Sequence, residues 1–564
     1  MFVVFEGTDG SGKTTVSNRV AERLRSGGLS VTHVRAEGKF ASAVSEAIRS
    51  LGRDSRNLEI APPAEFLLYV ARDVQLIEEA LRPALQRADV VLADRFLYTA
   101  EVLGRCGRGL PAEFSTPILK AAAGGLEPDL VIFVDVDPTL ARARRKAQKI
   151  EIRDARPPSR KGLSGVGLQH RMRRGYLELA EADPRRWVVV ENEGSLDDTV
   201  ARVTRLITEA RRIGAASAIE AFRAEWPGAR GNTAPLGSAE EATARFLSWL
   251  DARAEREPRV AAYFLGGMHG PAIDGRRRAL AERVPEAMLA ALGGLDDAVS
   301  WELRERLEPR FPAAVARSLS GLEQSDRAAA ARERLVQVAP LETLASAAWA
   351  DDERSWALRD RCFEELPRAV IASLAGLDTP RAWQLRERWL SRVESELPQD
   401  YEASRAALRS VYALDHERAW MLREVGRSVA PVAALNSIGR LLGARAWAWR
   451  ERYLRHAPKV VMATLRDIAE PAAWQLRSAV AAHCKEALDS VAGLDAPEAW
   501  RLREEHADTW PSTVVKSLGP LADAERGRAL LVRQLSRYPD NVSLLKHAAA
   551  IALGLHRGAP ARED

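Results

Sequence analysis

The chain has 564 residues, of which 46% are apolar and 29% charged, and its formal net charge is +5. A globular domain seldom exceeds about 250–300 residues, so we expect at least two domains, and so small a charge excess does not indicate a polyanionic partner. The three cysteines, Cys106, Cys362 and Cys484, lack metal-ligand spacing, which argues against a disulfide framework or a structural zinc site and fits a cytoplasmic protein.

Residues 1 to about 210 alternate short apolar runs with amphipathic stretches. The runs are nearly continuous in apolar character, as expected of parallel strands buried on both faces. They lie at 2–7, 30–36, 89–95, 129–137 and 186–192. Because Met1 leads directly into the first run, and no run of about 18 apolar residues occurs, we expect neither a signal peptide nor a membrane span. The alternation predicts an α/β domain with a parallel sheet over residues 1–210.

Residues 211–274 include WPGARGNTAPLGSAEEA and predict a linker followed by a helical adaptor. From about residue 275 the strand pattern ends and a repeat of about 27 residues begins. Each copy has a tryptophan, then leucine or a substitute, then arginine, and usually a proline eleven residues after the tryptophan. These tryptophans are Trp301, Trp356, Trp383, Trp420, Trp447, Trp474 and Trp500, with a degenerate copy at Ala329.

We interpret each copy as a helix pair with the proline in the first turn of the second helix. One pair cannot bury its apolar face alone, so the copies predict an all-α solenoid over residues 275–550, followed by a tail at 551–564. The regular spacing predicts that the tryptophans pack in a core rather than stack on nucleic acid. Arg and Glu in segments such as WELRER (301–306) lie at helical spacing, which predicts solvated faces with ion pairs between residues three or four positions apart.

The segment EGTDGSGKTT (6–15) contains the pattern GxxxxGK[ST] between a predicted strand and a predicted helix. Its glycines allow backbone angles that turn N–H groups toward phosphate oxygens, and the helix N-terminus adds a favourable dipole. We therefore expect an ATP-binding loop in which Lys13 reaches the β/γ-phosphates and Thr14 ligates Mg²⁺. The loop residues are Gly7, Thr8, Asp9, Gly10, Ser11, Gly12, Lys13 and Thr14.

Five segments, in the same order along the chain, resemble the thymidylate kinase family. They are FEG-x-DG-x-GKTT, EEALRPAL at 78–85, DRF at 94–96, VDVDPTLARARR at 134–145 and RMRRGYLELAEADPRRWVVVE at 171–191. The resemblance spans residues 1–210 and implies a P-loop nucleoside monophosphate kinase that converts dTMP to dTDP with ATP and Mg²⁺. It also implies a homodimer formed through this domain.

The resemblance further implies roles for single residues. Asp9 would lie near the acceptor sugar and the metal, Arg95 would bind the acceptor's phosphate, and Asp94 would hold the Mg²⁺ shell. Tyr69 would stack on the base, and Thr99 matches a small hydroxyl position beside the acceptor.

A lid would span about 146–168. Ser11 stands where some family members carry an arginine in the loop, so a lid arginine is expected to meet the transition-state charge. The candidates are Arg153, Arg156 and Arg160, with Lys161 beside them.

The base-reading residues depart from the family pattern. Arg72-Asp73 stands where the family usually has Asp-Arg, whose arginine helps to read thymine, and Leu103 stands where a tyrosine favours deoxyribose. Arg72 and Leu103 are thus expected to line the acceptor. Two alternatives stay open: a kinase for a different nucleotide, and a nucleotide-dependent switch or scaffold whose solenoid binds a protein partner.

Overall fold

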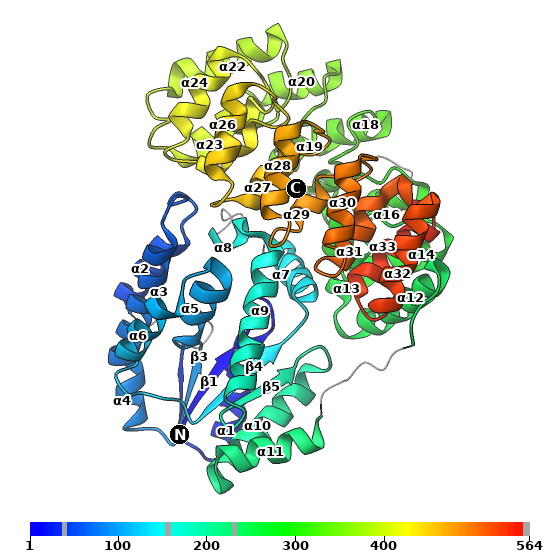
Figure 1. The fold of residues 1–564 in the computed structure, drawn as a ribbon. Helices are drawn as coiled ribbons and strands as arrows, with labels where there is room; N and C mark the ends of the chain where they lie inside the picture. The colour runs from blue at the N-terminus through cyan, green and yellow to red at the C-terminus, as the bar shows by residue number, and fades with distance from the viewer. Residues whose placement is uncertain (36–41, 153–159, 228–233, 556–564) are drawn as a thin grey trace. The chain divides into compact units, whose positions relative to one another are not determined.

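The computed structural model describes residues 1–35, 42–152, 160–227 and 234–555 (Figure 1). The chain divides into two compact units, one of Met1–Arg145 with Pro158–Asn232 and one of Lys146–Pro157 with Thr233–Asp564. They are called the α/β unit and the helical unit below. None of the helices in the described part of the chain has the length and apolar character that a membrane crossing requires.

The α/β unit contains a sheet of five parallel strands in the order β2-β3-β1-β4-β5. The strands are β1 (Phe2–Glu6), β2 (Val31–Val34), β3 (Val90–Asp94), β4 (Leu130–Asp135) and β5 (Trp187–Glu191). Each coincides with a predicted apolar run, which confirms the predicted fold class. The order of the strands reverses beside β1, so the loop that follows β1 opens into the crevice where parallel sheets bind ligands.

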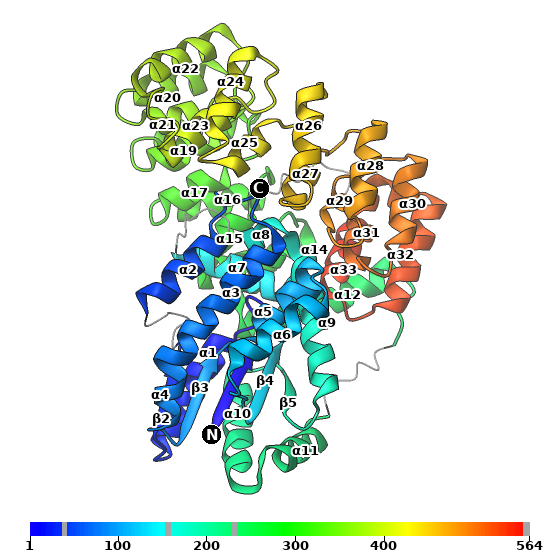
Figure 2. The same cartoon turned by 60° about the vertical axis from the view of Figure 1, so that its left-hand side comes forward.

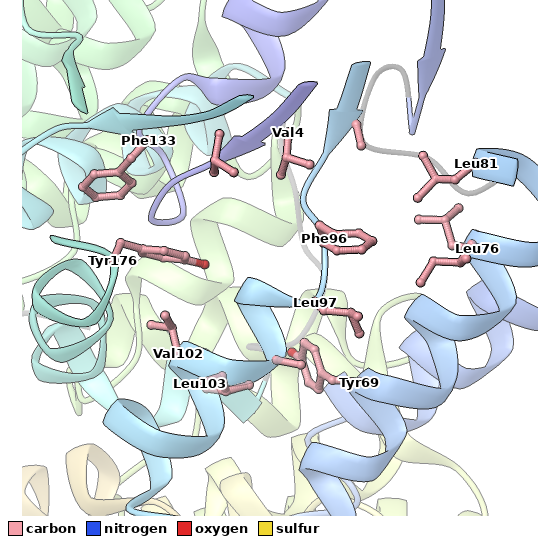
Figure 3. Close-up of a cluster of buried hydrophobic side chains, with 14 of the residues drawn as sticks. Val4, Tyr69, Leu76, Leu81, Phe96, Leu97, Val102, Leu103, Phe133 and Tyr176 are labelled. Atoms are coloured by element: carbon pink, nitrogen blue, oxygen red, sulfur yellow. The ribbon is translucent and has the colours of Figure 1, made fainter. Parts of the chain in front are cut away.

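Helices cover both faces of this sheet. They are α1 (Lys13–Ser26), α2 (Ala43–Arg53), α3 (Pro62–Leu76), η2 (Ile77–Leu81), α4 (Arg82–Leu85), α5 (Tyr98–Val102), η3 (Leu103–Gly107), α6 (Ala112–Ala123), α7 (Pro138–Ile152), α8 (Arg160–Leu163), α9 (Gly165–Ala182), α10 (Leu196–Ile213) and α11 (Ala215–Glu225). Alternate strand residues face opposite layers. Val4 and Phe133 pack in the layer with α3, α5 and α9 (Figure 3), whereas Val3 and Phe5 pack against α1, α10 and α11.

The expected boundary at residue 210 is wrong, because it falls inside α10. The next helix, α11, packs on α10, and its residues Ala218, Ile219 and Phe222 are buried in the same core as Val3. A helix that contributes apolar side chains to the sheet's core belongs to that domain. Residues 211–225 are therefore part of the α/β unit and not a linker.

The helical unit consists of consecutive helices, most of them in antiparallel pairs with short turns. They are α12 (Ala239–Arg256), α13 (Pro258–Phe264), α14 (Pro271–Arg283), α15 (Pro285–Ala291), α16 (Ala298–Leu307), α17 (Pro312–Ser318), α18 (Asp326–Leu335), α19 (Pro340–Ser346), α20 (Glu353–Cys362), α21 (Pro367–Ala372), α22 (Pro380–Val393), α23 (Tyr401–Ser410), α24 (Glu417–Gly426), α25 (Pro431–Ser437), α26 (Ala444–Tyr453), α27 (Pro458–Ala463), α28 (Pro471–Val480), α29 (Glu486–Asp489), α30 (Pro497–Glu505), α31 (Pro511–Leu518), η4 (Gly519–Asp523), α32 (Glu525–Arg537) and α33 (Val542–Ala552). The pairs α26–α27, α28–α29 and α30–α31 are clear in Figure 2.

The second helices of the pairs pack on one another in sequence, from α13 through α15 and onward to α31 and α33. The expected adaptor, α12, does not stand outside this array, since it packs on α13 and also on α33. Lys546 of α33 donates to the carbonyl of Gly266, and Arg245 of α12 donates to that of Pro539. The row of stacked helices thus closes on itself, which protects the end faces that an open array must cap.

The first arginine of each W-x-L-R motif contradicts the prediction of a solvated face. Arg423 is fully buried and donates to the carbonyls of Val411, Leu414 and Ser437 at 2.8–3.0 Å. Its guanidinium also lies 4.6 Å from the ring centroid of Trp420. The fully buried arginines at this position of the repeat are Arg304, Arg332, Arg359, Arg386, Arg423, Arg450, Arg477 and Arg503. Arg277 is also fully buried, but it donates to Asp274, Asp297 and Ser300.

These arginines are buried because the helices are short. Each turn between helices leaves carbonyl groups that have no hydrogen-bond partner within a helix. One guanidinium, with five donors in a fixed fork, satisfies carbonyls from two successive pairs at once. The later arginines of the motifs are solvated, as predicted, but their ion pairs reach the preceding helix pair instead of a residue three or four positions away. Arg306 and Arg334 are exposed and form ion pairs with Glu282 and Glu308 of the preceding pair.

Candidate functional site

The loop between β1 and α1 has the geometry of a phosphate-binding loop. Gly10 and Gly12 have φ angles of +93° and +89°, a region that side chains rarely adopt. A Cβ atom at Gly10 would lie 2.3 Å from the carbonyl oxygen of Ala141, and one at Gly12 would lie 2.5 Å from Nδ2 of Asn192. The loop therefore requires glycine at both positions, for its conformation as well as for space.

Hydroxyl groups of the loop are available to a ligand. Thr8 and Ser11 are buried, and their Oγ atoms have no hydrogen-bond partner among the described residues. Asn192 fixes the loop from outside by donating to the carbonyl of Ser11 at 2.8 Å. Unpartnered buried polar atoms are rare in proteins, so these hydroxyls fit a loop shaped to bind phosphate oxygens.

Lys13 begins α1 and is buried, with 8% of its surface exposed. Burial, together with the nearby Arg95, lowers the pKa of Lys13 to about 8, although Asp94 and Asp9 act in the opposite direction. The ammonium group is thus desolvated and held among charged groups before any nucleotide binds. A phosphate chain would supply the negative charge that this position lacks.

The lowered pKa of Lys13 predicts a pH dependence. Since Lys13 is protonated below pH 8 and neutral above it, kcat/KM for ATP is expected to fall about tenfold per pH unit above about pH 8. Lys13→Arg stays charged throughout this range and is expected to flatten the profile, whatever its absolute rate. Steady-state kinetics across the range test this, and a wild-type profile that stays level up to about pH 10 would contradict it.

Thr14 and Asp94 are the oxygen donors nearest to this lysine that fit a divalent cation. The Thr14 hydroxyl donates to Asp94 Oδ2 at 2.5 Å, while Asp94 Oδ1 is buried and has no hydrogen-bond partner in the described residues. Burial alone would raise the pKa of Asp94, but Lys13, Arg35 and Arg95 lower it below its usual value, so the carboxylate is ionised. A hydroxyl and an ionised carboxylate suit Mg²⁺, which prefers oxygen ligands.

The protein would supply only part of such a metal's ligand shell. Within the described residues, no group of three or more His, Cys, Asp or Glu side chains is arranged to hold a metal ion. This is the expected pattern for Mg²⁺ at a nucleotide site, where phosphate oxygens and water complete the shell.

Arg95 follows β3 and lies beside the loop. Its Nη2 donates to Asp9 Oδ1 at 2.8 Å, and its Nη1 donates to the Thr99 hydroxyl at 3.1 Å. Burial alone would lower the pKa of Arg95, but the neighbouring carboxylates of Asp9 and Glu6 raise it above its usual value. The structure thus brings together Lys13, Thr14, Asp9, Asp94, Arg95 and Thr99.

The residues expected at the base lie on α3 and at the start of η3. Arg72 is buried and donates to its neighbour Asp73 at 2.7 Å, and its guanidinium lies 4.7 Å from the ring centroid of Tyr69. Burial raises the pKa of Asp73, against the opposing effect of Arg72. Leu103 is buried in the same apolar core as Tyr69. The exchanged order of Arg72 and Asp73 therefore produces a buried ion pair.

The structure gives no side-chain positions for the lid arginines. Arg153 and Arg156 lie outside the described residues, as does the side chain of Arg160. Sequence reasoning also missed several groups near the loop. Arg35 donates to the carbonyl of Asp94 at 2.7 Å, and Arg173 forms a bidentate pair with Asp135. The signal for Arg173 was its place in the matched segment 171–191.

Comparisons with known proteins cover the α/β unit. Residues 5–203 match the family model described as "Thymidylate kinase". The chain is 35% identical over 211 residues to the thymidylate kinase of Deinococcus radiodurans, which covers 37% of this chain and 97% of that protein. It is 35% identical over 212 residues to the thymidylate kinase of Pelobacter propionicus, covering 37% and 94%. A crystal structure of thymidylate kinase from Ehrlichia chaffeensis is 20% identical with a TM-score of 0.28, covering 37% of this chain and 98% of that chain.

Proposed function

The chain belongs to the thymidylate kinase family, and on that premise we propose that its α/β unit transfers the γ-phosphoryl group of ATP to dTMP, giving dTDP and ADP. The observation that carries the proposal is the cluster of Lys13, Thr14, Asp94 and Arg95 at the carboxyl ends of β1 and β3. This cluster supports the proposal because a loop suited to the donor's phosphates lies beside a buried arginine suited to the acceptor's phosphate.

The chain's residues would act by positioning and by charge. The loop N–H groups and Lys13 hold the β- and γ-phosphates of ATP, and Arg95 holds the phosphate of dTMP. An oxygen of that phosphate attacks the γ-phosphorus in line, and the bond from the γ-phosphorus to the bridging oxygen of ADP breaks. The acceptor oxygen is already anionic, so no general base is needed. Mg²⁺, held by Thr14 and Asp94, would neutralise charge on the phosphates.

Three further groups complete the proposal. The lid arginines Arg153, Arg156 and Arg160 would supply positive charge to the transferring phosphoryl group, because Ser11 provides none in the loop. Asp9, which is 23% exposed at its side chain and already paired with Arg95, would border the acceptor sugar. Tyr69, Arg72 and Leu103 would line the side of the site that receives the base.

Acceptor preference tests the proposal. Initial rates with ATP and Mg²⁺ are measured for dTMP, dUMP, UMP, CMP, dCMP, dGMP and AMP. We expect dTMP to give the highest kcat/KM. The base would bind beside the Arg72–Asp73 pair, whose order is the reverse of the family's usual Asp-Arg. Arg72→Lys retains the charge but not the planar fork, so it is expected to change the ranking of bases more than the rate with ATP.

Other outcomes would redirect the proposal. A different preferred acceptor would mean that the Arg72–Asp73 pair has changed the base specificity of an intact kinase. No turnover on any acceptor, combined with ATP binding, would favour a nucleotide-dependent switch with the helical unit as its protein-binding arm.

As finer parts of the proposal, we place the enzyme in the cytoplasm and expect a homodimer through the α/β unit. Sedimentation would test the homodimer.

A further inference from the structure

Arg95 is held from two sides that differ in their access to solvent. On one side, Nη2 donates to Asp9, whose side chain is 23% exposed. On the other side, Nη1 donates to the hydroxyls of Thr99 at 3.1 Å and Tyr176 at 3.4 Å, both of which belong to buried residues. Of these three partners, Asp9 is the one with an exposed side chain, so we expect a ligand to approach Arg95 from the Asp9 side.

Glu6 organises the buried side. It ends β1 and is fully buried, and its carboxylate accepts hydrogen bonds from the Phe96 N–H at 3.0 Å and from the Thr99 hydroxyl at 2.8 Å. The same carboxylate lies 3.7 Å from Nη1 of Arg95. The bond to Phe96 also fastens the turn in which Arg95 has a φ of +82°, a conformation that residues other than glycine rarely adopt. Glu6 therefore restrains both the backbone and the side chain of Arg95.

Tyr176 reaches the same group from α9. Its ring stacks on Phe133 of β4, with centroids 5.2 Å apart and an interplanar angle of 28° (Figure 3). Its hydroxyl lies 3.1 Å from Oγ1 of Thr99. Burial raises the pKa of Tyr176 well above its usual value, so the group is a neutral phenol. Because the ring is stacked and buried, the hydroxyl has little freedom to move and holds its hydrogen-bond partners in a fixed position.

We propose that Glu6 and Tyr176 are positioning residues that act on Arg95 both directly and through Thr99 and fix the plane of its guanidinium, so that its Asp9-facing edge is presented to the acceptor's phosphate. This inference rests on the proposed function, in which Arg95 binds that phosphate. It also gives Thr99 a role: its hydroxyl links Glu6, Tyr176 and Arg95 instead of contacting the substrate.

Tyr176→Phe tests the inference by removing one hydroxyl and keeping the stacked ring. We expect KM for dTMP to rise about three- to tenfold, the effect of losing the hydrogen bonds of the hydroxyl to Thr99 and Arg95, with KM for ATP and the melting temperature unchanged. Tyr98→Phe is the matched control, because Tyr98 packs against the same core from α5 but makes none of the contacts to Arg95 or Thr99 described above. A merely structural role would lower the melting temperature or change both KM values together.

Glu6→Gln is the second variant, since it preserves shape and removes the charge. We expect KM for dTMP to rise about tenfold or more, again with little change in KM for ATP. Equal KM values in Tyr176→Phe, Glu6→Gln and Tyr98→Phe would overturn the inference while leaving the kinase function intact. A wild-type protein without turnover on any nucleoside monophosphate would instead overturn the proposed function, and the inference with it.

Discussion

Lys13→Ala is expected to lower kcat/KM for ATP by about a thousandfold and at the same time to raise the melting temperature of the α/β unit. The loss of rate follows from removing the ammonium group that, in the proposed function, holds the β- and γ-phosphates. The gain in stability follows from burial, which lowers the pKa of Lys13 from 10.5 to about 8. Since the folded pKa lies below the unfolded one, the charged lysine at pH 7 favours unfolding, and its removal relieves that cost.

Kinetics and calorimetry on the same preparation measure the two effects. Lys13→Met, which keeps the apolar length of the side chain, is the matched variant and is expected to show the same pair of changes. A variant that loses activity and stability together would indicate damage to the loop, and would contradict the assignment of Lys13 to phosphate binding.

Arg423→Met is expected to destabilise the helical unit by about 3–5 kcal/mol. Arg423 donates to three carbonyls and to the Ser437 hydroxyl from a fully buried position, and methionine can satisfy none of these acceptors. Leaving several buried acceptors without a donor costs more than losing the bonds themselves. Because neighbouring helix pairs share these bonds, the effect should spread beyond a single repeat.

Denaturant unfolding followed by tryptophan fluorescence measures this effect, since most tryptophans lie in the helical unit. Arg445→Met is the matched control: Arg445 precedes the next motif, its side chain is 58% exposed, and it pairs with Glu417 on the surface. We expect it to cost less than about 1 kcal/mol. Similar midpoints for the two variants would show that the buried arginines do not hold the repeats together.

These buried arginines mark a limit of sequence reasoning. An arginine at helical spacing beside a glutamate has the pattern of a solvated face, and the pattern is correct for Arg306 and Arg334. Arg423 has the same pattern, but its partners are carbonyls of residues 411 and 414 in the preceding turn and of residue 437 in the following helix. Only the packing of successive helix pairs brings those acceptors together, so no local signal could reveal them.

The α/β unit was more predictable because its signals are local. A buried parallel strand needs a continuous apolar run, and the phosphate loop needs glycines at fixed spacing, so β1 and the cluster around Lys13 followed from the sequence. Glu6 and Tyr176 lie inside the matched segments, but their contact with Thr99 joins residues more than 75 positions apart. The expected domain boundary at 210 is wrong because core packing holds α11 in the α/β unit. Core packing produces no change in amino-acid composition that the sequence would show.

Transfer of the γ-phosphoryl group to dTMP is tested most directly by following the γ-phosphate of labelled ATP in the presence of dTMP, Mg²⁺ and the full chain. If the α/β unit phosphorylates dTMP, the label appears in dTDP, one ADP forms for each dTDP, and Lys13→Ala abolishes both products. Release of the label as inorganic phosphate without dTDP would contradict this activity, because the cluster around Lys13 and Arg95 would then hydrolyse ATP without serving the acceptor.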